Sequence, residues 1–189
     1  GIVAWGDDTQ SGGKYHVRLN DGAGGGTIRS ESQGGNRIGS TYLANGQWHH
    51  VVSVLTGPNN DLVQHWIDGK AERTSAGRSQ AIDIDIDDTD GDTREEPVSI
   101  GSRRQGAREY FHGQIDDVRI YDHVLSTSEV SALAGSIASH DAYEAEVVAD
   151  NPVGYWRLNE SDNTEAALSE GAAGGVDGTY EGGVTVGQS

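Results

Sequence analysis

The densest group of side chains that could do chemistry is an acidic run at residues 83–96, which holds six Asp, two Glu and one Arg. Carboxylate oxygens are hard ligands and suit Ca²⁺. The candidate calcium ligands are Asp87, Asp88, Asp90, Asp92 and Glu95. The run is not an EF-hand, because aligning Gly91 with the EF-hand glycine puts Ile86 and Pro97 at ligand positions. A solvated acidic loop that holds no metal is the alternative.

The same acidic residues do not form the pair that sugar hydrolysis needs, which is two carboxylates roughly 5–9 Å apart across the sugar. Asp83, Asp85 and Asp87 alternate with isoleucines on a predicted half-buried strand. No apolar neighbour on their own face would turn one of them into a proton donor. The sequence also lacks a Gly-x-Ser-x-Gly nucleophile elbow. We therefore expect no catalytic residues and no enzymatic activity.

Two of the seven His residues are adjacent, at His49 and His50. Neighbouring side chains on a strand point to opposite faces, so these two cannot share a metal ion. We expect them to be packed or hydrogen-bonded within the fold.

Sugar binding would use exposed aromatic rings beside polar groups. The candidate ligand-binding residues are Trp66, Tyr42, Tyr110 and Tyr121. Packing in the core or in an interface is the alternative for each of them. The remaining three tryptophans, Trp5, Trp48 and Trp156, are predicted to fill the core.

Composition favours many short strands joined by glycine-rich turns, because the 189 residues include 28 Gly and only 34% are hydrophobic. The strongest predicted strand runs from residue 47 to 55 and is apolar on both faces. The net charge of −17 argues against nucleic acid and anionic membranes as partners. No apolar run approaches the ~18 residues of a membrane span, so we expect no membrane insertion.

A strand and a helix are predicted near residues 110–134. Val118 and Ile120 share one strand face, and the adjacent Asp116 and Asp117 mark a predicted bulge just before them. The helix should begin after Ser126, which forms a Ser-x-x-Glu capping box with Glu129. Leu125 and Val130 stand at the two positions of a hydrophobic staple around this cap.

These residues resemble the closing strand and helix of laminin-G-like domains, which are concanavalin A-like. Three further segments support the resemblance, and all four occur in the family's order; the three are Gly46–Val52, Trp66–Lys70 and Val98–Ser102. The resemblance implies an all-β fold, a two-sheet antiparallel jelly-roll sandwich with a short helix near residues 126–134.

The order of the family's segments is rotated in this chain. Residues 1–134 resemble the later strands of one domain, residues 135–151 are predicted to be a linker with a short helix, and residues 152–189 resemble the opening strands of a copy. The last segment either completes a sandwich or starts the next copy of a tandem array. We expect residues 155–158 to pair in a sheet, within the chain or with a neighbour, with Trp156 as the core anchor.

The resemblance implies non-catalytic recognition or adhesion outside the cell or at its surface. The partner would be a glycan or an extracellular protein, bound by one module of a larger protein. An alternative is a structural repeat of an extracellular fibre, in which neighbouring copies share strands. A third possibility is a carbohydrate-binding module attached to an enzyme elsewhere in the parent chain.

Overall fold

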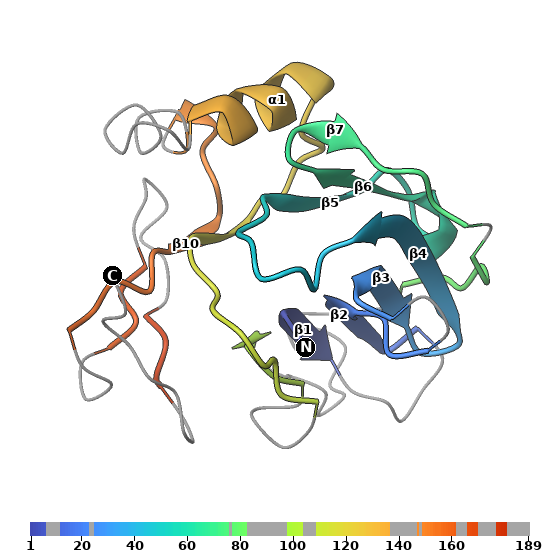
Figure 1. Ribbon diagram of the computed structural model, residues 1–189, viewed down its shortest axis with the longest axis horizontal. Helices are drawn as coiled ribbons and strands as arrows, with labels where there is room; N and C mark the ends of the chain where they lie inside the picture. The colour runs from blue at the N-terminus through green and yellow to red at the C-terminus, as the bar shows by residue number, and fades with distance from the viewer. Residues whose placement is uncertain are drawn as a thin grey trace, which may run out of the picture. The chain divides into compact units, whose positions relative to one another are not determined.

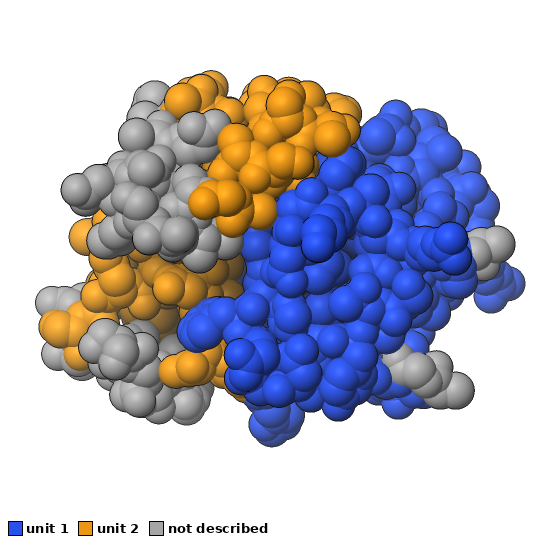
Figure 2. Space-filling view, turned by 45° about the horizontal axis from the view of Figure 1, so that its top comes forward, with its two compact units in different colours: residues 1–112 blue, residues 113–189 orange. Residues whose placement is uncertain are grey.

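The computed structural model describes residues 1–6, 12–22, 25–75, 77–82, 98–103, 109–136, 147, 149–161, 166–169 and 177–180. The chain divides into two compact units, Gly1–His112 and Gly113–Ser189 (Figure 2). Each unit is described by itself below. Among the described residues, no helix is long and apolar enough to cross a membrane.

Unit 1 contains an antiparallel five-stranded sheet with the order β4-β3-β2-β1-β8 (Figure 1). Its strands are β1 (Val3–Gly6), β2 (Lys14–Leu19), β3 (Thr27–Ser32), β4 (Gly35–Tyr42) and β8 (Ser99–Ile100). Side chains alternate between the two faces of these strands. Tyr15 is buried on one face of β2, and Lys14 and Arg18 extend from the other.

A second, three-stranded sheet of unit 1 has the order β5-β6-β7. Its strands are β5 (Val51–Leu55), β6 (Val63–Ile67) and β7 (Lys70–Ala71), and a 3-10 turn, η1 (Asn60–Leu62), joins the first two. The predicted strand over residues 47–55 is too long, because β5 begins only at Val51. The N–H of His50 donates to Asp68 Oδ1 at 2.9 Å instead of joining a strand ladder.

The two sheets of unit 1 enclose a common apolar core. Ile28 on β3, Leu43 after β4 and Ile67 on β6 form a buried cluster. Residues packed against this cluster are Ile2, Val17, Leu19 and Val51. Because the cluster takes side chains from both sheets, unit 1 is a two-sheet antiparallel sandwich, as the sequence predicts.

Unit 2 contains α1 (Thr127–Ser136), and its capping box is formed as predicted. The N–H of Ser126 donates to Glu129 Oε2 at 2.6 Å, and the N–H of Glu129 donates to Ser126 Oγ at 3.3 Å. Leu125 and Val130 are both buried, as the staple requires. The first helical turn therefore has partners for backbone donors that the helix itself leaves unpaired.

The other described element of unit 2 is a two-stranded antiparallel sheet of β9 (Val118–Ile120) and β10 (Gly154–Trp156). The predicted pairing of residues 155–158 is confirmed for Tyr155 and Trp156, whose partners are in the same chain. The strand ends there, and Leu158 adopts a left-handed φ of 57°. Asp117, where the bulge is predicted, is also left-handed with a φ of 51°.

The predicted core anchor of this strand is wrong. Tyr155 is almost completely buried, whereas Trp156 is only half-buried. The hydroxyl of Tyr155 donates to Asp117 Oδ1 at 2.9 Å, so its polar end has a partner inside the unit. Tyr155 therefore anchors β10, because its ring can be buried without leaving the hydroxyl unsatisfied.

Candidate functional site

The acidic run does not lie in the part of the chain that the structure describes. All five candidate calcium ligands (Asp87, Asp88, Asp90, Asp92 and Glu95) fall outside the described residues, as does the predicted strand beyond Ile82. Among the described residues, no group of three or more His, Asp or Glu side chains could hold a metal ion. Calcium binding by the acidic run stays a prediction.

The four aromatic candidates divide into two exposed and two packed side chains. Tyr42, at the end of β4, is 57% exposed, and Tyr110 is 60% exposed. Trp66 is half-buried on β6, where it pairs with Val52 and Ala71. The exposed rings are therefore the better placed candidates in unit 1.

Tyr121 belongs to unit 2 and is packed. Its ring lies edge-on to His123, with the ring centroids 5.6 Å apart. Burial of the ring raises the pKa of Tyr121. Tyr121 is therefore half-buried within unit 2, and ligand binding by its ring stays a prediction.

The structure exposes one ring that the sequence assigns to the core. Trp48 is 63% exposed, whereas Trp5 is half-buried beside Tyr15 at a centroid distance of 5.0 Å. The core prediction for Trp48 is wrong, because it assumes a strand that already includes residue 48. The adjacent Asn45 and Gly46 form a typical turn pair and could have indicated the correct boundary.

Trp48 lies on the connection between β4 and β5, and we call residues 42–50 the aromatic loop. A polar clamp holds the loop on both sides of Trp48. Asn45 Oδ1 accepts a hydrogen bond from the N–H of Gln47 at 2.9 Å and lies 3.1 Å from His49 Nε2. His49 Nδ1 in turn lies 2.9 Å from Asp68 Oδ2.

The carboxylate of Asp68 joins the aromatic loop to the turn after β6. Partial burial opposes its ionisation, but the hydrogen bonds from the His49 ring and the His50 N–H outweigh this, so the pKa of Asp68 is lowered. The predicted structural role of the adjacent histidines agrees with these contacts. Asp68 therefore holds the loop in place as an ionised group.

A buried Ser–His contact has the elements of a nucleophile and its base, but lies where no substrate can reach. His65 Nε2 lies 3.2 Å from Ser30 Oγ, and its Nδ1 lies 2.9 Å from Ser53 Oγ. His65 and Ser30 are completely buried. Burial lowers the pKa of His65 to about 4, so the imidazole is neutral at pH 7. This arrangement connects the two sheets rather than performing catalysis.

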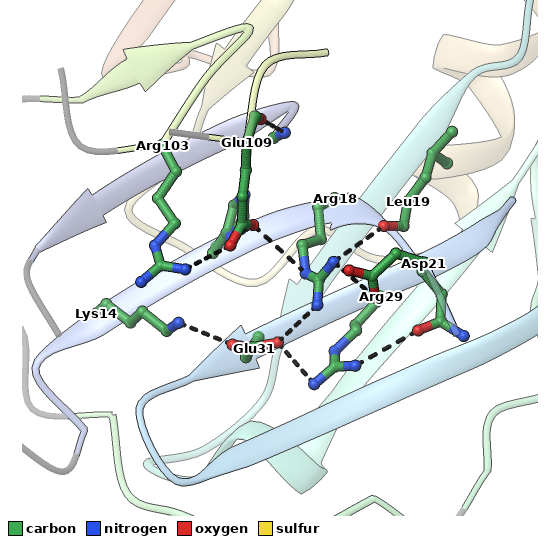
Figure 3. Close-up of polar contacts among 11 residues, drawn as sticks. Lys14, Arg18, Leu19, Asp21, Arg29, Glu31, Arg103 and Glu109 are labelled. Atoms are coloured by element: carbon green, nitrogen blue, oxygen red, sulfur yellow. Dashed lines mark hydrogen bonds and ion pairs between the residues drawn. The ribbon is translucent and has the colours of Figure 1, made fainter. Parts of the chain in front are cut away.

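One sheet face of unit 1 carries a cluster of ion pairs (Figure 3). Glu31 on β3 contacts Lys14 at 2.7 Å, Arg29 at 2.7 Å and Arg18 at 3.3 Å. Burial opposes ionisation of Glu31, but its cationic partners outweigh burial and lower its pKa. The cluster is held by its own contacts, so we assign it a structural role.

The ion pairs continue to either side of Glu31. Asp21 contacts Arg18 at 3.2 Å, and Glu109 contacts Arg103 at 2.6 Å. The alternation of charged side chains on β2 and β3 places Lys14, Arg18, Arg29 and Glu31 on one face, and that signal is present in the sequence. Their pairing across strands depends on register, which the sequence does not state.

Comparison with a protein-family model agrees with the fold. A laminin G family model, described as the concanavalin A-like lectin/glucanases superfamily, matches residues 2–131. No curated protein matches the chain. A solved structure of an S-layer domain-containing protein from Clostridium thermocellum ATCC 27405 is 20% identical, with a TM-score of 0.36.

That alignment covers 69% of this chain and 66% of the other, so it spans just under two thirds of the S-layer protein's solved chain. The family match covers most of unit 1 and extends through β9 into α1. It confirms the resemblance that the four sequence segments carry, and this chain belongs to the concanavalin A-like lectin/glucanases superfamily, with a laminin-G-like domain.

Proposed function

We propose that this chain is a non-catalytic recognition module of an extracellular or cell-surface protein, and that it binds a glycan or an extracellular protein. The observation that carries the proposal is the exposure of three large aromatic rings on unit 1, namely Tyr42, Trp48 and Tyr110. Aromatic side chains combine apolar area with low conformational entropy, and they are enriched where proteins bind ligands. Membership of a family that is built around binding modules supports the same conclusion.

The contacts of two buried ionisable groups, His65 and Glu72, support recognition rather than catalysis. His65 is neutral between two hydroxyls, and Glu72 accepts hydrogen bonds from Ser40 N–H, Ser40 Oγ and Thr41 N–H at 2.7–3.0 Å. All three bonds to Glu72 go to Oε1, and both groups are held by partners inside the fold. A general acid or base must instead reach a proton of the substrate.

The proposal is tested with the full chain on a glycan array and on a panel of extracellular matrix proteins. We expect saturable binding to at least one class, and we expect a bound oligosaccharide to be recovered uncleaved by mass spectrometry. Absence of binding to both panels would contradict recognition. Cleavage of a bound glycan would contradict the non-catalytic part of the proposal.

A second candidate function is a structural repeat whose copies share strands, and the β9–β10 pair favours it. β10 begins at Gly154, beyond residues 2–131 that the family match covers, yet it pairs with β9 inside that range. β10 of one copy could therefore pair with β9 of another copy, because the contacts between the two strands would be the same as within one chain. This assembly would produce dimers or fibres by strand addition.

The absence of cysteine from the chain allows a direct test of strand sharing. Val118 and Trp156 are opposite partners, so their Cα atoms stand about 4.5–5.5 Å apart, within the range that a disulfide spans. Oxidising a mixture of Val118→Cys and Trp156→Cys chains should give crossed covalent dimers if strands are shared. Finding monomers alone would contradict strand sharing. In the control mixture Leu168→Cys, at an exposed position, takes the place of Trp156→Cys.

A further inference from the structure

Tyr42, the last residue of β4, and Trp48, on the connection that follows it, are both more than half exposed. Large aromatic side chains are mostly buried in proteins of this size, because exposing them leaves apolar area in water. Two such rings within the aromatic loop therefore need an explanation other than packing.

The first end of the aromatic loop is fixed to the core. Leu43 is buried with Ile28 and Ile67, and its N–H donates to the carbonyl of Gly26 at 2.7 Å. Gly26 has a φ of 84°, and a Cβ at this position would lie 2.6 Å from Tyr42 Cε2. The ring of Tyr42 therefore rests directly on backbone, and a side chain at position 26 would displace it.

The other end is fixed by the polar clamp around Trp48. Both sequence neighbours of Trp48 are held, Gln47 by its N–H to Asn45 and His49 by its contacts with Asn45 and Asp68. Ordering a loop on binding costs free energy, and a loop that is already ordered avoids that cost. The aromatic loop is therefore preorganised with both rings exposed to solvent.

The surroundings of the two rings favour a small polar ligand over a protein. Between Tyr42 and Trp48 the only large apolar side chain is Leu43, which is buried in the core. Exposed large apolar side chains are therefore confined to the two rings themselves. A stable protein interface buries about 800 Å² on each partner and has a contiguous apolar centre. A pyranose sugar presents a flat C–H face for an aromatic ring and a rim of hydroxyls for neighbouring amides.

The charge of the chain further narrows the ligand class. A net charge of −17 repels sulfated and uronate-rich chains over the distance at which partners first meet. Neutral glycans carry no such penalty. We propose that Trp48 and Tyr42 form a stacking site for the pyranose rings of a neutral glycan, with Asn45 and Gln47 beside them. This inference rests on the proposed recognition function.

The proposal is tested by titrating the full chain with neutral hexasaccharides of glucose, mannose, galactose and N-acetylglucosamine, and with heparin. Calorimetry gives the affinity, and the fluorescence change that the unmodified chain shows but Trp48→Phe lacks reports on Trp48 among the four tryptophans. We expect at least one neutral hexasaccharide to bind and heparin not to bind. Trp48→Ala should weaken binding by about tenfold or more, and Trp48→Phe, which keeps a ring, should weaken it less. Tyr42→Ala should also weaken binding.

Leu62→Ala is the matched control, because Leu62 is an exposed apolar side chain of unit 1 that lies outside the aromatic loop. Its affinity should equal that of the unmodified chain. Urea denaturation of each variant separates loss of binding from loss of folding. Neutral glycan binding that survives Trp48→Ala would overturn the stacking site while leaving the recognition function intact. Binding of heparin or of protein alone would likewise overturn the neutral-glycan assignment.

Discussion

Ser30 Oγ on β3 lies 3.2 Å from His65 Nε2 on β6, and this contact connects the two sheets of unit 1 through the core. The other ring nitrogen of His65 lies 2.9 Å from Ser53 Oγ on the adjacent strand β5. A neutral imidazole suits the pair, because it donates through one nitrogen and accepts through the other. Protonation would remove the acceptor and place a charge in a buried site.

The first prediction concerns acid. Burial lowers the pKa of His65 from 6.5 to about 4. As the pH falls, this side chain is protonated in the unfolded chain before it is protonated in the folded one. Its contribution to the free energy of unfolding is therefore fully present above pH 6.5 and is lost as the pH drops from 6.5 to 4. The expected loss from this group is about 3 kcal/mol. Urea denaturation at pH 7 and pH 4 measures it.

His65→Gln is the control for this prediction. It should be less stable than the unmodified chain at pH 7, because it alters a buried hydrogen-bonded site. It should nevertheless lose less stability between pH 7 and 4. His16, whose pKa burial also lowers to about 4, will keep part of the acid sensitivity in both proteins. Equal losses in the two proteins would show that His65 does not carry this effect.

The second prediction concerns the helix cap. Ser126→Ala removes the oxygen that accepts the N–H of Glu129 and should lower the free energy of unfolding by ~1 kcal/mol. Val130→Ala should cost a similar amount or more, since Val130 is completely buried. Thr127→Ala, one position into the helix, should have little effect. If Ser126→Ala and Thr127→Ala have the same denaturation midpoint, the cap does not stabilise α1.

The cap and the aromatic loop show which features a sequence can predict. Ser126 and Glu129 are three residues apart, so a short stretch of sequence contains both partners of the capping box. The exposure of Trp48 depends on Asp68, whose carboxylate accepts the His50 N–H from 18 residues away, so that β5 begins only at Val51. Alternation of apolar residues predicts a strand but cannot show where a distant carboxylate interrupts it.

The anchor of β10 likewise depends on a long-range contact that local sequence does not show. Alternation predicts correctly that Tyr155 and Trp156 face opposite ways, but it does not show which face is covered. That depends on Asp117, which accepts the Tyr155 hydroxyl from 38 residues away. The family fold could thus be predicted from four local segments, whereas both aromatic assignments required long-range contacts.

The third prediction tests this anchor. Tyr155→Ala should destabilise the chain by about 3–5 kcal/mol, in the range for loss of a buried aromatic ring. Tyr155→Phe should cost about 1 kcal/mol, because it removes only the hydrogen bond to Asp117. Trp156→Ala should cost less than Tyr155→Ala. The reverse order in thermal denaturation would restore Trp156 as the anchor of β10.

The fourth prediction separates calcium binding from charge screening. With a net charge of −17, the chain should become more stable as sodium chloride screens its self-repulsion. If the acidic run at residues 83–96 binds Ca²⁺, about 1 mM calcium should add stability beyond sodium at equal ionic strength. At one to ten times the dissociation constant this addition is about 0.4–1.4 kcal/mol.

The double substitution Asp88→Asn and Asp90→Asn should remove the calcium increment and keep the sodium effect, since it removes two of the five candidate ligands. A second double variant, Asp21→Asn with Asp122→Asn, removes the same formal charge at exposed positions outside the run and should keep both effects. Calorimetric melting of the three proteins in matched salts decides between the two explanations. If calcium and sodium act equally at matched ionic strength in all three, the acidic run is a solvated loop and its carboxylates contribute only to the net charge.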